Sequence, residues 1–117
     1  MKFVSELKRT NYCGSLRATH AGQTVNLMGW VDTRRDHGGL VFIDLRDREG
    51  LVQVVLDPSK AAMKDAHVVR GEFVVGVRGV VRARPQGMTN KKRATGEVEL
   101  EAESLEVLSE AKTPPFL

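Results

Sequence analysis

Phe42 and Gln53 stand where their side chains could bind one planar, hydrogen-bonding ligand. They lie in the stretch GGLVFIDLRDREGLVQVVLDP, residues 38–58, in which two runs of alternating residues flank a polar Arg–Glu turn. This pattern predicts a β-hairpin with a period of two. If the chain turns there, Asp44 faces Gln53, and Phe42 is the diagonal neighbour of Gln53 on the same face. An aromatic ring and an amide would then lie side by side.

A nucleic acid base has the chemistry that suits this pair. A base stacked on Phe42 would gain about 1–3 kcal/mol whatever its identity. The amide of Gln53 presents a donor beside an acceptor, which complements the Watson–Crick edge of uracil. The alternative is that Phe42 packs beneath a loop and that Gln53 is an ordinary solvated strand residue.

Alternating glutamates near the C-terminal end offer a second kind of base contact. The stretch EVELEAESLE places Glu97, Glu99, Glu101 and Glu103 at every second position. It therefore predicts an amphipathic strand with an acidic outer face. Guanine presents its N1–H and N2–H2 donors together, and one outward carboxylate could accept both. For most of these glutamates the better interpretation is a solvated edge that resists aggregation.

Positive charge is concentrated in one segment although the net charge is only +3 and the pI about 9.3. No acid interrupts the basic residues Arg82, Arg84, Lys91, Lys92 and Arg93. Such a patch is typical of a surface that holds phosphates. The residue chemistry thus indicates a protein that binds single-stranded nucleic acid with some base preference, and it leaves RNA and DNA open.

Five strands and one helix are predicted to position these groups. The strands are expected at residues 24–36, 40–46, 51–56 and 72–84, with a fifth beginning near Glu97 and a short helix within 59–70. This order is that of an OB barrel, in which strands two and three and the loops joining strands one to two and four to five form the ligand face. We therefore expect an all-β fold with one short helix, a five-stranded OB-fold barrel.

The composition limits the classes of protein to consider. The 117 residues suffice for one core, and 41% hydrophobic with 28% charged residues argues against both a membrane protein and a disordered chain. The opening MKFVSELKRTN contains no secretory signal or membrane span, so we expect a cytoplasmic protein. Cys13, the single cysteine, excludes an internal disulfide and is expected to be buried. The three histidines lack metal-ligand spacing, so no metal site is predicted.

The chain closely resembles the N-terminal anticodon-binding domain of bacterial aspartyl-tRNA synthetases. The matching text is NYCGSLRATHAGQTVNLMGWVDTRRDHGGLVFIDLRDREGLVQVV, followed by GVVRARPQGMTNKKRATGEVELEAESLEVLSEAKTPPF. It covers nearly the whole chain, from Tyr12 to Phe116. The resemblance implies that the partner is tRNA(Asp), whose anticodon bases are guanine or queuine, uracil and cytosine.

The resemblance also implies roles for individual residues. Phe42 would stack under the middle uracil, Gln53 would read that base, and Glu99 would read the wobble purine. Further contacts to the anticodon loop are implied for Arg35, Arg82, Arg84 and, near the third base, Asn90. Three aspartates also match the family text, and for these we expect structural roles in turns and strand pairing: Asp36, Asp44 and Asp47.

His37 and Gly87 bear on which tRNAs are charged. In synthetases of this family that charge both tRNA(Asp) and tRNA(Asn), the position of His37 tends to be histidine, where strict enzymes carry leucine. A glycine recurs in them at the position of Gly87. The resemblance therefore implies a non-discriminating enzyme that uses both tRNAs. The alternative is that both are ordinary solvated loop residues.

The expected organisation is an N-terminal extension (1–12), an OB-fold anticodon-binding domain (13–109) and the start of a linker (110–117) to a class II catalytic domain outside this chain. ATP and Mg²⁺ would bind in that domain, through which the parent enzyme would form a homodimer. The present chain carries no catalytic motif or Gly-rich phosphate loop. It is expected to bind RNA without a cofactor and without catalysis. The alternatives are a free-standing single-strand binding module, a protein-interaction domain, or a relative specific for asparagine or lysine.

Overall fold

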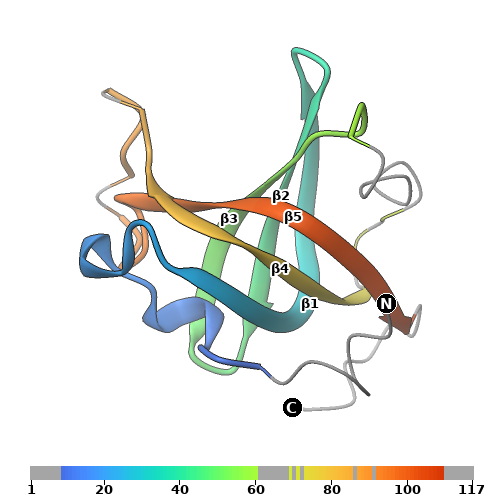
Figure 1. Ribbon diagram of the computed structural model, residues 1–117, viewed down its shortest axis with the longest axis horizontal. Coiled ribbons are helices and arrows are strands. Elements are labelled where there is room, and N and C mark those ends of the chain that lie inside the picture. Colours follow the sequence, from blue (N-terminus) through green and yellow to red (C-terminus); the bar gives the residue numbers. More distant parts are fainter. Residues whose placement is uncertain are drawn as a thin grey trace.

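The computed structural model describes residues 9–60, 69, 71, 73–85, 87–90 and 92–109. Within them, five strands close into a barrel in the order β1-β2-β3-β5-β4 (Figure 1). The strands are β1 (Thr24–His37), β2 (Leu40–Asp47), β3 (Gly50–Leu56), β4 (Val74–Ala83) and β5 (Val98–Ser109). Two single turns of 3-10 helix, η1 (Cys13–Ser15) and η2 (Ala18–His20), precede them. The predicted five-stranded barrel is confirmed; the predicted helix within 59–70 falls almost wholly outside the described residues.

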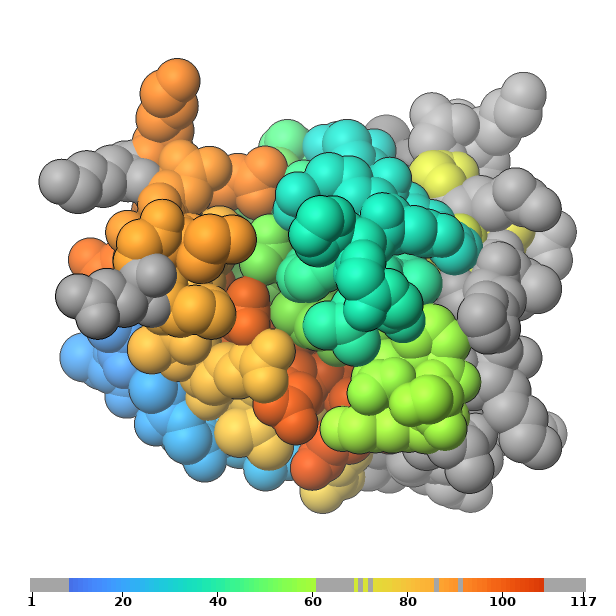
Figure 2. All heavy atoms as spheres, turned by 90° about the horizontal axis from the view of Figure 1, so that it is seen from above, coloured from blue at the N-terminus to red at the C-terminus, as the bar shows by residue number. Residues whose placement is uncertain are grey.

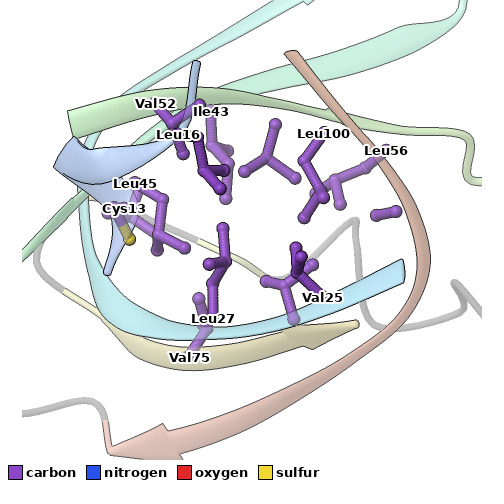
Figure 3. Packing of buried hydrophobic residues seen from close by; sticks show 14 of the residues in the cluster. Cys13, Leu16, Val25, Leu27, Ile43, Leu45, Val52, Leu56, Val75 and Leu100 are labelled. Atoms are coloured by element: carbon purple, nitrogen blue, oxygen red, sulfur yellow. The ribbon is translucent and has the colours of Figure 1, made fainter. Parts of the chain in front are cut away.

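The β2–β3 hairpin has the predicted register. Asp44 pairs with Gln53, and Phe42 pairs with Val55, so Phe42 and Gln53 are diagonal neighbours. The period of two sends the other face of both strands inward, where Ile43 and Val54 are fully buried. Figure 3 shows this face meeting residues of β1, β4 and β5 in one cluster. Burial of the apolar face is what holds the polar face outward.

Strand β1 contains an irregularity in its pairing with β2. The register with β2 shifts between Val31 and Thr33. Gly29 allows a close approach of the two strands, because a Cβ there would overlap the carbonyl oxygen of Arg46. The bulge follows two residues later, where the outer half of the strand leaves the barrel. There β1 and β2 project together as a hairpin arm (Figure 1).

The barrel closes by a short seam between β3 and β5. Only Val54 and Val55 of β3 pair with β5, in parallel. The preceding half of β3 faces the loop between β4 and β5 instead. There the Thr95 hydroxyl donates a hydrogen bond of 2.7 Å to the carbonyl oxygen of Leu51. Sheet pairing therefore stops beside Gln53, leaving space for side chains to meet.

The N-terminal turn η1 covers the end of the barrel at which β2 turns into β3. Cys13 and Leu16 are fully buried, as expected for the cysteine. The carboxylate of Asp47 accepts hydrogen bonds from the backbone N–H groups of Cys13 at 2.6 Å and Glu49 at 2.9 Å. Burial, with the neighbouring Asp47 carboxylate, raises the pKa of the Cys13 thiol well above its usual value. Asp47 thus has the structural role expected of it.

Candidate nucleic-acid interface

A groove of about 770 Å³ lies between the β1–β2 arm and the β4–β5 loop, over the outer face of β2 and β3. Figure 2 shows this face, with the loop (orange) on one side and the arm (teal) on the other. Of the nine residues predicted to bind or discriminate RNA, eight line the groove: Arg35, Phe42, Gln53, Arg82, Arg84, Gly87, Asn90 and Glu99. The fold brings together residues that are up to 64 positions apart in the chain.

Phe42 is half-buried and lines the groove floor. The guanidinium carbon of Arg35, on the adjacent strand, lies 5.6 Å from the centroid of the Phe42 ring. A ring in this position offers an apolar platform with a cation at its side. This is the arrangement in which bases stack on OB folds.

Gln53 stands at the centre of a hydrogen-bond network. Its Oε1 accepts from Arg35 Nη2 at 3.0 Å, and its Nε2 donates to Glu99 Oε1 at 2.9 Å. A guanidinium only donates and a carboxylate only accepts, so the amide is held in one orientation. One lone pair of Oε1 and one N–H of Nε2 remain free of this network. The amide is thus both fixed and still able to pair with a ligand.

Glu99 is buried, with only 3% of the residue exposed, in contrast to the solvated outer face expected for most of these glutamates. Arg82, its cross-strand partner on β4, donates from Nε to Glu99 Oε2 at 2.7 Å. Arg82 also donates from Nη1 to the carboxylate of Glu101. Glu103 is exposed, as expected. The difference arises because Glu99 sits at the β3–β5 seam, where Gln53 and Arg82 cover it.

Arg84 lies at the start of the β4–β5 loop and ties the loop to β5. Its Nε donates to the carbonyl oxygen of Val98 at 3.1 Å, and its Nη1 donates to that of Met88 at 3.4 Å. Nη2 is buried and has no hydrogen-bond partner among the described residues. Burial, together with the nearby Arg93 charge, lowers the pKa of Arg84. One donor of this arginine is therefore buried and unsatisfied beside the groove.

An ion pair that the sequence interpretation missed joins the loop to β2. Arg93 donates from Nη1 and Nη2 to the two carboxylate oxygens of Asp44, at 2.7 and 3.1 Å. Thr33 donates to the same carboxylate at 2.7 Å. Burial raises the pKa of Asp44, but the hydrogen bonds from Arg93 and Thr33 and the Arg93 charge outweigh it, so this pKa lies below its usual value. The sequence showed Arg93 only as part of a basic patch, without its partner.

His37 and Gly87 lie on opposite sides of the groove. His37 is exposed at the end of β1 and does not line the groove. Gly87 has a backbone φ of 82°, in the left-handed region that favours glycine. The groove residues that the sequence interpretation did not select are Leu40, Asp44, Pro85, Met88, Thr89, Lys92 and Arg93. Met88 is a large hydrophobic side chain that is 64% exposed, a feature that sequence alone does not reveal.

The groove carries a surplus of positive charge among its described residues. Five basic side chains and two carboxylates line it. Among the described residues, no group of three or more His, Cys, Asp or Glu side chains could hold a metal, and no helix is long and apolar enough to cross a membrane. A flat ring, a fixed amide, a carboxylate and surplus cations suit a single-stranded nucleic acid with its bases turned inward.

The family comparison agrees with this chemistry. The model of the tRNA anticodon family, an OB-fold nucleic acid binding domain, matches residues 25–108. The chain belongs to this family.

Relatives along the whole chain are aspartate–tRNA ligases. The chain is 60% identical over 97% of its length to the aspartate–tRNA(Asp/Asn) ligase of Moorella thermoacetica, and 58% identical over 93% to the aspartate–tRNA ligase of Listeria monocytogenes. It covers 19% of each relative, so it spans about a fifth of their length. The asparaginyl-tRNA synthetase structure from Pyrococcus horikoshii matches 90% of the chain and 24% of its own, at 29% identity and a TM-score of 0.71.

Proposed function

We propose that this chain is the anticodon-recognition domain of an aspartate–tRNA ligase. The observation that supports this most directly is the network Arg35–Gln53–Glu99–Arg82 beside the half-buried ring of Phe42. It supplies a stacking platform and polar groups of defined orientation in one positively charged groove. The aspartate–tRNA ligases at 60% and 58% identity support the same assignment.

The middle base of the anticodon is the one that Gln53 reads. Uracil stacked on Phe42 presents N3–H and O4 side by side. The free lone pair of Gln53 Oε1 accepts from N3–H, and the free N–H of Nε2 donates to O4. Both existing bonds, to Arg35 and Glu99, persist during this contact. Cytosine at this position presents an acceptor where uracil presents a donor, so it is rejected.

The wobble purine is the base that Glu99 reads. Guanine would donate N1–H and N2–H2 to the carboxylate. Because Arg82 and Gln53 cover this carboxylate, the base reaches it only when Arg82 rotates away. The released Arg82, with Arg84, then contacts the phosphates of the loop. Binding of the first base is thus coupled to a rearrangement at the β3–β5 seam.

The parent enzyme would attach aspartate to tRNA(Asp) and also to tRNA(Asn). The two tRNAs share the wobble and middle bases and differ at the third, cytosine or uracil. His37 can donate or accept, and Gly87 has no side chain, so neither residue excludes one of these pyrimidines. ATP, Mg²⁺ and the dimer interface belong to a catalytic domain outside this chain, in a cytoplasmic homodimer. One relative is named an aspartate–tRNA(Asp/Asn) ligase and another an aspartate–tRNA ligase.

Titration of labelled RNA hairpins tests the proposal. Hairpins with the aspartate anticodon, the asparagine anticodon and an unrelated anticodon are compared at several salt concentrations. We expect similar affinities for the first two, within about tenfold or 1.4 kcal/mol, and weaker binding of the third. Affinity should fall by roughly 0.7 log units per tenfold salt for each phosphate neutralised. Equal affinity for all three would favour a free-standing single-strand binding module instead.

A further inference from the structure

The β4–β5 loop is held against the barrel by two side chains at its C-terminal end. Arg93 pairs with Asp44 on β2, and Thr95 bonds to the carbonyl oxygen of Leu51 on β3. Asp44 is itself held by Thr33 of β1. Asp44 is only 5% exposed, so the carboxylate side of the ion pair is buried. The loop position therefore depends on a buried carboxylate two residues after Phe42.

Arg93 is also the last residue of a turn that orients Asn90. The backbone N–H of Arg93 donates to the carbonyl oxygen of Asn90 at 3.2 Å, and that of Lys92 donates to Asn90 Oδ1 at 3.0 Å. The backbone N–H of Asn90 donates to the carbonyl oxygen of Gly96 at 2.9 Å across the loop. The side-chain oxygen of Asn90 is thus used within the turn, which leaves its Nδ2 as the group able to donate into the groove.

We propose that Asp44 and Arg93 are positioning residues for the third anticodon base, acting through Asn90; this inference rests on the function proposed above. The ion pair fixes the turn, the turn fixes the Asn90 side chain, and Nδ2 donates to the base. Cytosine and uracil both carry an O2 acceptor beside N3, so one donor at a fixed distance serves either pyrimidine. The larger ring system of a purine would clash with the β4–β5 loop.

Asp44 has a second effect, since it neutralises a cation that faces the RNA. Arg93 lines the groove with its guanidinium occupied by the carboxylate. Removing the carboxylate frees this charge for a phosphate. Loss of Asp44 and loss of Arg93 should therefore have the same effect on base preference and different effects on the salt dependence of binding. Substitution of a residue that only stabilises the fold would not separate base preference from the salt dependence of binding in this way.

The experiment compares Asp44→Asn, Arg93→Gln, Arg93→Lys and the double variant Asp44→Asn/Arg93→Gln with the wild-type chain. Arg46→Gln is the charge-matched control, since it breaks an exposed pair with Asp32 at 3.2 Å outside the groove lining. Hairpins carry cytosine, uracil or adenine at the third position, and a second set varies the middle base. Dissociation constants are measured at three salt concentrations, and circular dichroism confirms folding of each variant.

We expect Asp44→Asn and Arg93→Gln each to lower the preference for a third-position pyrimidine over adenine at least fivefold, with no further loss in the double variant. The middle-base preference should stay unchanged, and Arg93→Lys should restore part of the loss. The salt slope should steepen by about 0.7 in Asp44→Asn but not in Arg93→Gln. An unchanged third-base preference in folded Arg93→Gln, or an equal loss at both bases, would overturn the inference. A wild-type chain without base preference would instead overturn the proposed function.

Discussion

Asp44 on β2 and Gln53 on β3 form one cross-strand pair, so the carboxylate that anchors the β4–β5 loop lies beside the amide placed to read a base. Both face the groove, and each is bonded to a different element: Asp44 to Arg93 of the loop, Gln53 to Glu99 of β5. A shift in either strand would therefore move the loop and the amide together. This coupling makes the following variants informative.

Phe42→Ala should weaken binding of the aspartate anticodon hairpin by about 1–3 kcal/mol, because a stacking platform is lost. The melting temperature should change little, since the ring is half-buried and lines the groove. Phe73→Ala is the matched control, because Phe73 packs against the core. It should lower the melting temperature and spare RNA affinity. Thermal melts and binding curves on both variants distinguish a platform from a core residue, and a reversed pattern would contradict the assignment.

Gln53→Glu should abolish the preference for a middle uracil, because a carboxylate cannot donate to O4. The new carboxylate would also face Glu99, which Gln53 contacts at 2.9 Å. Two such acids raise the pKa of one of them, so this variant takes up a proton on folding and gains stability relative to wild type as pH falls. Urea unfolding at pH 5 and 8 measures this.

Gln23→Glu serves as the control for the preceding variant. Gln23 is exposed and directly precedes β1, and its substitution adds the same negative charge. It should show no comparable pH dependence and no change in base preference. A Gln53→Glu variant that still favours a middle uracil would show that another group reads this base.

His37→Leu should widen the difference in affinity between the aspartate and asparagine anticodon hairpins. The imidazole can donate or accept, whereas leucine can do neither and adds an apolar group at the end of β1. His37 is exposed, so the free energy of unfolding should change by less than about 0.5 kcal/mol. Hairpin titrations check the first effect and urea unfolding the second. A wild-type preference of a hundredfold or more for the aspartate hairpin would place the parent enzyme in the strict class.

Asp44→Asn should lower the free energy of unfolding by about 1–3 kcal/mol at neutral pH, because Arg93 and Thr33 lose an ionised acceptor. The pKa of Asp44 lies below its usual value in the folded chain. Its contribution is therefore fully present above the unfolded value near 3.9 and disappears as pH falls through the folded value. The difference between wild type and variant should shrink below about pH 4. Asp32→Asn, which removes an exposed pair, should cost less than about 1 kcal/mol at every pH.

The sequence by itself determined the β2–β3 register and the pairing of Phe42 with Gln53 as diagonal neighbours. A strand has a period of two, so burying Ile43 and Val54 forces Phe42, Asp44 and Gln53 to the outer face. The order of the strands along the chain and the position of the loop between β4 and β5 followed from the same periodicity. These are local properties, which a single chain expresses without knowledge of its distant contacts.

Only the tertiary structure decided which charges are paired. Glu99 has the same alternation as Glu103, yet it is buried because barrel closure brings Gln53, 46 residues away, against it. Arg93 resembles its basic neighbours in sequence, yet it pairs with Asp44, 49 residues away. The bulge between Val31 and Thr33 is likewise a feature of how β1 pairs with β2. Hydrogen bonds and ion pairs act only over a few ångströms, so their partners depend on how the barrel closes and where the loop folds.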